Sequence, residues 1–174
     1  MRLKQEQFVP FMIVVGILTM IIIIYSSFRF NTKQHEQFKE NLAESDSLIT
    51  MNMRVVGESD SVNVADLKGN TSLLVFWASW SDKSRSMLDE IQLLQNEYDS
   101  LKVIAVLVKD AEESLASNKE YPDFYYTDGV KLFNYLQVPG FPSYVLFDEN
   151  SRVLTSEVGY EKGVGYDSLK VFMP

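Results

Sequence analysis

The sequence predicts an α/β fold with a central mixed β-sheet flanked by helices, preceded by one N-terminal transmembrane helix. Three observations lead to this prediction. Residues 8–28 form an uncharged apolar run, two shorter apolar runs at 72–77 and 102–108 are typical of buried strands, and apolar residues at helical spacing fill the segment between them. Strands that alternate with amphipathic helices build a sheet covered by helices.

The N-terminal apolar run is long enough to cross a bilayer. Residues 8–28 carry no charge, and a helix of that length spans roughly 31 Å, close to the thickness of the hydrocarbon core. The small-x-small site that follows a cleaved signal peptide is missing after Ile24. We therefore expect residues 1–28 to be a retained membrane anchor. The basic residues on the two sides nearly balance, so they do not decide its orientation: Arg2 and Lys4, against Arg29, Lys33 and Lys39.

Residues 29–50 are predicted to be a juxtamembrane spacer. The segment is polar, but Phe38, Leu42 and Leu48 suggest a short amphipathic helix that extends the anchor. The only histidine of the sequence, His35, lies here. A lone histidine in a spacer is expected to be a solvated side chain rather than a ligand or a catalytic base.

Residues 51–174 are predicted to form one domain. Its helices are expected at 82–98, where Met87, Leu88, Ile91, Leu94 and Tyr98 recur at helical spacing, and more briefly around 112–119, 130–136 and 166–172. The aromatic-rich run 121–136 has the spacing of a core strand and helix. The strands outside that run are expected at 51–56, 61–67, 72–77, 102–108, 143–148 and 152–158, and the last two form a hairpin over 148–151.

Charge and cysteine content exclude several function classes. The net charge is −8, and because Arg2, Lys4 and Glu6 give the first 28 residues +1, the rest carries −9. Such an acidic body repels phosphate backbones, so nucleic-acid binding is not expected. There is no cysteine, which excludes disulfides, thiolate chemistry and cysteine-ligated metals. No cofactor or metal site is predicted.

Two motifs in the domain resemble a known family. Residues 65–81, ADLKGNTSLLVFWASWS, are similar to the strand and active-site loop of membrane-anchored thioredoxin-like (redoxin) proteins of the TlpA/ResA type, whose signature is FWA-x-W-C-x-x-C. The two cysteine positions of that signature are Ser81 and Ser84 here. Downstream, VPGFPSYVLFDENSRVL resembles the family's cis-proline segment. Pro142 falls at the cis-proline, and Ser151 stands where the following turn usually has glycine.

The resemblance covers roughly residues 51–172, which is nearly the whole of the chain outside the apolar anchor and spacer, and the N-terminal anchor fits it too. It implies a thioredoxin-like fold and a domain outside the cytoplasmic membrane, on the periplasmic or outer face. In redox-active relatives, the loop tryptophan, the cysteine pair and the cis-proline segment form the groove that holds a partner's extended chain. The resemblance therefore implies a partner-binding groove at Trp80, Ser81, Asp82, Lys83, Ser84, Phe141 and Pro142.

The missing sulfur changes what this site is expected to do. A serine hydroxyl is far less acidic than a thiol and cannot form a mixed disulfide. It becomes a nucleophile only beside a positioned base, and an exposed Lys83 next to Asp82 is not expected to be one. We therefore predict no catalytic residue. Ser81 is better explained as the N-cap of the following helix, with Asp82 complementing the helix dipole.

Three functions remain open. The first is a membrane-tethered, non-catalytic domain that binds a protein or peptide outside the cytoplasm. The second is an accessory component of a thiol-disulfide or cytochrome c maturation-type pathway, with cysteines supplied by a partner. The third is a purely architectural envelope domain. The arrangement of Trp80 and Phe141 distinguishes the binding domain from the architectural one. In a binding domain the two side chains form an exposed surface, and in an architectural domain they merely pack together.

Overall fold

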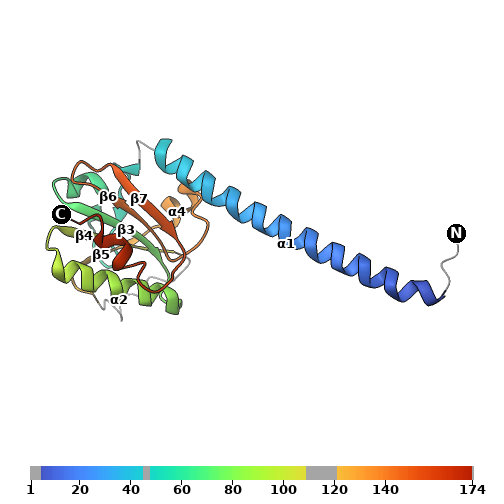
Figure 1. The fold of residues 1–174 in the computed structure, drawn as a ribbon. Coiled ribbons are helices and arrows are strands. Elements are labelled where there is room, and N and C mark those ends of the chain that lie inside the picture. Colours follow the sequence, from blue (N-terminus) through green and yellow to red (C-terminus); the bar gives the residue numbers. More distant parts are fainter. Residues whose placement is uncertain (1–4, 45–47, 109–120, 174) are drawn as a thin grey trace.

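The computed structural model describes residues 5–44, 48–108 and 121–173, with side chains from residue 8 onward. A five-stranded mixed sheet lies between helices on both faces, and one long helix projects from this domain toward the N-terminus (Figure 1). This is the predicted α/β architecture. The helix expected around 112–119 lies outside the described residues.

The central sheet has the strand order β5-β4-β3-β6-β7. Strands β3 (Thr71–Trp77), β4 (Leu101–Leu107) and β5 (Phe124–Asp128) run parallel, while β6 (Ser143–Phe147) and β7 (Val153–Val158) form an antiparallel hairpin beside β3. Every residue of β3 is buried, as expected for a strand covered on both faces. The strands predicted at 72–77, 102–108, 143–148 and 152–158 are confirmed. In the hairpin turn, Ser151 adopts a φ of 63°, the left-handed conformation that usually favours glycine.

Helices cover the two faces of the sheet with two separate hydrophobic cores. Leu73, Val75 and Trp77 of β3 face a core shared with α2 (Asp82–Glu97) and α5 (Asp167–Lys170). Leu74 and Phe76 face the opposite core, which includes α4 (Val130–Leu136). This alternation is the two-residue period of a strand. The helices predicted at 82–98, 130–136 and 166–172 are confirmed, the last with a shorter span.

The prediction of a strand over 61–67 is wrong for most of that segment. Only Ser61–Val62 is extended, as β2, and it pairs with β1 (Met53–Arg54) in a two-stranded ribbon. Residues Val64–Leu67 form a 3₁₀ helix, η2. Its start is fixed by a capping box, in which Asn63 Oδ1 accepts from the Asp66 N–H at 2.9 Å and the Asp66 carboxylate accepts from the Asn63 N–H at 3.0 Å. This local capping overrides the apolar alternation of the strand pattern.

Helix α1 (Gln5–Glu44) joins the apolar run to the domain without a break. Among the described residues it is the one helix long and apolar enough to cross a membrane. Its last turns pack on the domain: Phe38 and Leu42 are 1% and 6% exposed, and Asn41 Nδ2 donates to the Leu136 carbonyl at 3.0 Å. Part of the predicted spacer therefore belongs to the packed core. The boundaries 1–28, 29–50 and 51–174 stay predictions.

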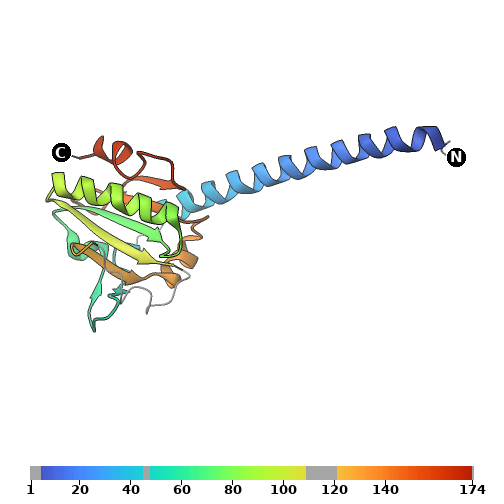
Figure 2. The same ribbon diagram turned by 90° about the horizontal axis from the view of Figure 1, so that it is seen from below.

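Glu90 of α2 fixes the C-terminal segment. One carboxylate oxygen accepts from the Tyr160 hydroxyl at 2.8 Å and from the Gly163 N–H at 2.9 Å, and the other accepts from the Gly165 N–H at 2.8 Å. Gly163 has a φ of 93°, and a Cβ at Gly165 would lie 2.7 Å from a backbone oxygen of α2. Only glycine fits this close approach, so α2 is held between the sheet and the C-terminal segment (Figure 2).

We predict that Glu90→Gln destabilises the fold by roughly 1–3 kcal/mol, because one of its two acceptor oxygens becomes an amide that points N–H groups at a backbone N–H. Urea denaturation of the full chain in detergent measures this as a lower midpoint. Glu161→Gln is the matched control, since Glu161 is exposed on the same segment and its replacement should change stability by less than about 0.5 kcal/mol. Equal urea midpoints for the two variants would contradict the role of Glu90 in holding the C-terminal segment on α2.

Candidate functional site

The candidate site begins where β3 ends and α2 begins. The chain leaves the sheet at Trp77, turns through Ala78–Trp80, and enters α2 at Asp82. Ser81 is the N-cap, with the extended backbone of a cap residue and a side-chain oxygen that accepts from the Ser84 N–H at 3.3 Å. This confirms the predicted N-cap. The bond satisfies one of the helix donors that lack a partner within the helix.

Ser84 has a structural role that the sequence did not indicate. Its side chain is fully buried, and its hydroxyl oxygen accepts from the Ala78 N–H at 3.3 Å. Ala78 is itself buried, so this backbone donor cannot bond to water. Both serines therefore bond to backbone N–H groups, and Ser84 ties the end of β3 to the first turn of α2.

The polar residues between the serines face solvent. Asp82 and Lys83 are exposed, and the Asp82 carboxylate bonds the Arg85 guanidinium at 2.6 Å. The i,i+3 spacing of Asp82 and Arg85 could have predicted this pair. Lys83 lacks the burial that a neutral catalytic lysine needs, as expected.

Trp80 and Phe141 meet across the site. Their ring centroids are 5.2 Å apart and their planes are 86° apart, an edge-to-face contact. Trp80 nevertheless remains 62% exposed, and Phe141 is half-buried. The Phe141–Pro142 peptide bond is cis, as the resemblance implied, and Pro142 is buried. The two residues thus pack together and also present an aromatic surface; its use in binding stays a prediction.

The phenol of Tyr144 is not available as a base for the serines. Burial, with a smaller contribution from the charge of Glu157, raises the pKa of Tyr144 to about 12, so its phenol stays protonated at neutral pH. His35, predicted from the sequence to be solvated, lies on α1 and is half-buried. The described residues contain no group of three or more His, Asp or Glu side chains that could hold a metal.

A cavity of about 1070 Å³ lies away from this site. It opens between the β1–β2 ribbon, the C-terminal end of α2 and the first residues of β4 and β5, and acidic residues dominate its charged lining: Glu58, Asp60, Asp66, Asp99 and Asp123, with Lys102. The serine turn is at the other end of α2. The cavity and the candidate site are therefore separate.

Comparison with solved structures identifies the architecture. The chain superimposes on a putative thiol:disulfide interchange protein DsbE from Chlorobium tepidum with a TM-score of 0.60 and 23% identity, over 70% of this chain and 91% of that one. The chain has the thioredoxin-like fold. A secreted disulfide oxidoreductase of Mycobacterium tuberculosis gives a TM-score of 0.57 at 14% identity, over 67% of this chain and 88% of that chain.

Sequence comparison finds a relative with higher identity over a shorter part of the chain. The chain is 32% identical over 113 residues to Thioredoxin-like protein YneN of Bacillus subtilis (strain 168), covering 63% of this chain. It spans 64% of the length of that relative. No protein-family model matches.

We predict that Ser84→Ala destabilises the thioredoxin-like domain by roughly 1–3 kcal/mol, because it leaves the buried Ala78 N–H without an acceptor. Ser81→Ala should cost about 1 kcal/mol through loss of the cap, whereas Ser81→Asp should cost only a few tenths, because aspartate also caps helices. Urea midpoints of the full chain measure all three. A Ser84→Ala variant as stable as the native chain would contradict the role given to this hydroxyl.

Proposed function

We propose that this chain is a membrane-anchored thioredoxin-like protein, related to thiol-disulfide oxidoreductases, that binds an extended polypeptide outside the cytoplasm and exchanges no disulfides with it. The observation that carries this proposal is the exposed Trp80 held on Phe141, beside a turn in which serine occupies both positions of the redox cysteines.

The chemistry of the turn supports the absence of disulfide exchange. Exchange needs a thiolate that attacks a disulfide sulfur and is released again from a mixed disulfide. Oxygen cannot take the place of sulfur in that intermediate, and the hydroxyls of Ser81 and Ser84 accept bonds from backbone N–H groups. Lys83 is exposed and Tyr144 stays protonated. Neither side chain therefore supplies the base that a serine nucleophile needs.

The aromatic surface supports binding. Aromatic side chains that are exposed and held by packing lose little conformational entropy when a partner covers them, and tryptophan is enriched among residues that dominate binding energy. Neither backbone polar group of Phe141 bonds to another described residue. A partner in extended conformation could add its own N–H and C=O groups there, as a strand adds to a sheet edge.

The location outside the cytoplasm rests on the resemblance and on one relative. The M. tuberculosis structure is of a secreted protein, and α1 is apolar enough to anchor the chain in a membrane. The fold similarity to thiol:disulfide interchange proteins also favours a second candidate function, an accessory subunit that holds a substrate while a partner supplies cysteines.

We predict that the full chain in detergent binds an unfolded polypeptide without thiols, such as reduced and carboxymethylated α-lactalbumin, and that Trp80→Ala weakens this binding at least tenfold. A tenfold loss corresponds to about 1.4 kcal/mol, within the range of interface hot spots. Fluorescence anisotropy of the labelled probe measures the affinity. Tyr125→Ala is the matched control, because Tyr125 is an exposed aromatic on β5, at the cavity rather than the site. Equal losses in both variants would contradict the proposal.

With dithiothreitol as the electron donor, we predict that the native chain reduces insulin no faster than dithiothreitol alone, and that the double variant Ser81→Cys, Ser84→Cys accelerates the reduction. The helix N-terminus favours a thiolate at position 81 through its dipole and unpaired N–H groups. The single variant Ser84→Cys is the control, because one thiol cannot complete the cycle. Reduction by the native chain would overturn the central chemical argument.

A further inference from the structure

Helix α1 fixes how the domain sits on the membrane. No glycine or proline lies in residues 28–44, so nothing in the sequence favours a kink between the apolar run and the domain. At its C-terminal end, Phe38 and Leu42 are buried in the domain core, and Asn41 bonds the backbone of α4. The anchor and the domain are therefore connected as one rigid unit rather than by a flexible linker.

The candidate site lies on the side of the domain from which α1 projects. In both Figure 1 and Figure 2, the N-terminal end of α2, drawn in green, points toward the N-terminus of α1, and the C-terminus lies at the far end. Parallel strands β3 and β4 end on this side, so the turn that carries Trp80 does too. Because the apolar run of α1 leaves in the same direction, this side of the domain faces the bilayer.

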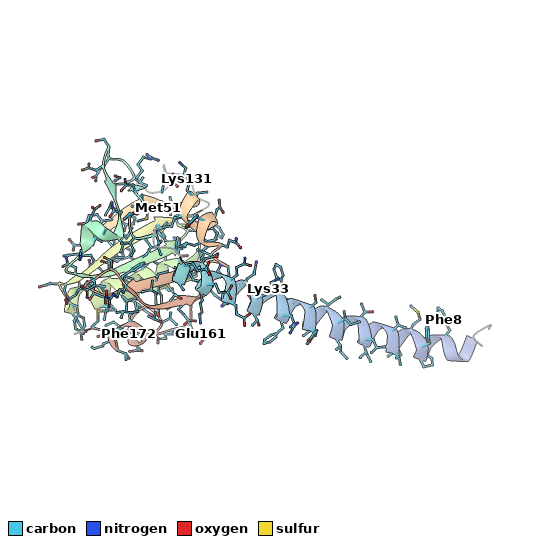
Figure 3. The ribbon with its side chains drawn as sticks, turned by 90° about the horizontal axis from the view of Figure 1, so that it is seen from above. Phe8, Lys33, Met51, Lys131, Glu161 and Phe172 are labelled. Atoms are coloured by element: carbon cyan, nitrogen blue, oxygen red, sulfur yellow. The ribbon has the colours of Figure 1, made fainter. Side chains whose placement is uncertain are left out.

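The domain lies close to the membrane surface. Figure 3 shows that α1 from Phe8 to Lys33 stands clear of the domain, and Phe38 is the first of its fully buried side chains. Phe38 lies ten residues after Phe28, the end of the apolar run. A helical rise of 1.5 Å per residue therefore places the docked turns about 15 Å from the hydrocarbon. Headgroups fill roughly the first 5–8 Å of that distance. Phe141 packs against the same core as Phe38, so we take the space in front of the Trp80 surface to be of similar size. Such a space suits an extended chain better than a folded domain, since stacked sheets lie about 10 Å apart.

We infer that the surface of Trp80 and Phe141 binds the extended segment that flanks a transmembrane helix of another protein in the same membrane. This inference rests on the proposed polypeptide-binding function and names the class of partner. Lipid is the less suitable occupant, because residues 29–174 carry a net charge of −9 and an anionic bilayer surface repels them. A flanking segment is already concentrated in the thin layer that the surface faces, which raises its effective concentration.

The orientation is tested with spin labels, for which the absence of native cysteine is an advantage. Lys83→Cys and Asp99→Cys place one nitroxide at each end of α2, both at exposed positions. The full chain is reconstituted in nanodiscs that contain a nickel-chelating lipid. We expect clearly stronger relaxation of the Lys83 label than of the Asp99 label. Equal or reversed relaxation would overturn the inference.

The occupant is tested with two synthetic probes. One is a Leu/Ala transmembrane peptide with a six-residue flank of alternating Phe and Ser, and the other is the flank alone in solution. Six extended residues reach about 20 Å. This is longer than the distance of about 15 Å between the hydrocarbon and the docked turns of α1. We expect the membrane-inserted probe to bind at least tenfold more tightly than the free flank, on a common concentration scale, and Phe141→Ala to remove binding of both.

A variant of α1 separates this inference from the proposed function. Insertion of an 11-residue alanine-rich helix after Asn31 adds about three turns, which raises the domain by about 16 Å and rotates it by only about 20°. We expect it to abolish the advantage of the membrane-inserted probe and to leave binding of the free flank unchanged. Free-flank binding without any advantage of insertion would refute the inference alone. No binding of either probe would refute the polypeptide-binding function as well.

Discussion

The hydrogen bond from the Ala78 N–H to the Ser84 hydroxyl is the constraint on which the site depends. Strand β3 is covered on both faces, so the chain that leaves it carries a buried N–H that water cannot reach. Ser84 supplies the acceptor, and Ser81 caps the helix that follows. The hydroxyl oxygens of the two serines thus stabilise the geometry of the turn. Trp80 packs against Phe141 although the sulfur atoms needed for disulfide exchange are absent.

The domain also depends on its anchor helix. One face of the sheet is covered by α4 and η2, and Phe38 and Leu42 of α1 complete that core. Burial of a large apolar side chain stabilises a fold by about 2 kcal/mol. Removal of the whole N-terminal helix would therefore expose part of the core as well as remove the candidate membrane span. The same packing is the basis of the inferred orientation, because a flexible linker would leave the direction of the site relative to a bilayer undefined.

Strong local patterns made much of the fold predictable. Strands β3 and β4 are continuous apolar runs, and α2 has an apolar stripe at helical spacing, so both types of element were identified from the sequence. The segment 63–67 was not, because Val62 and Val64 mimic a strand while the Asn63–Asp66 capping box selects a 3₁₀ turn. Phe38 and Leu42 were seen to share one helix face, but only tertiary structure shows what that face covers.

The local features of the site were also predictable, and its contacts between more distant residues were not. The N-cap role of Ser81 follows from local rules, and the cis bond before Pro142 followed from the resemblance. The bond between Ser84 and Ala78 did not, because it joins residues six apart through the path of the turn. The most direct measurement is amide hydrogen exchange of Ala78 in the native full chain. We predict protection close to that of the core strands, since this N–H should open only when the domain unfolds. Exchange at the rate of an unstructured amide would contradict the account.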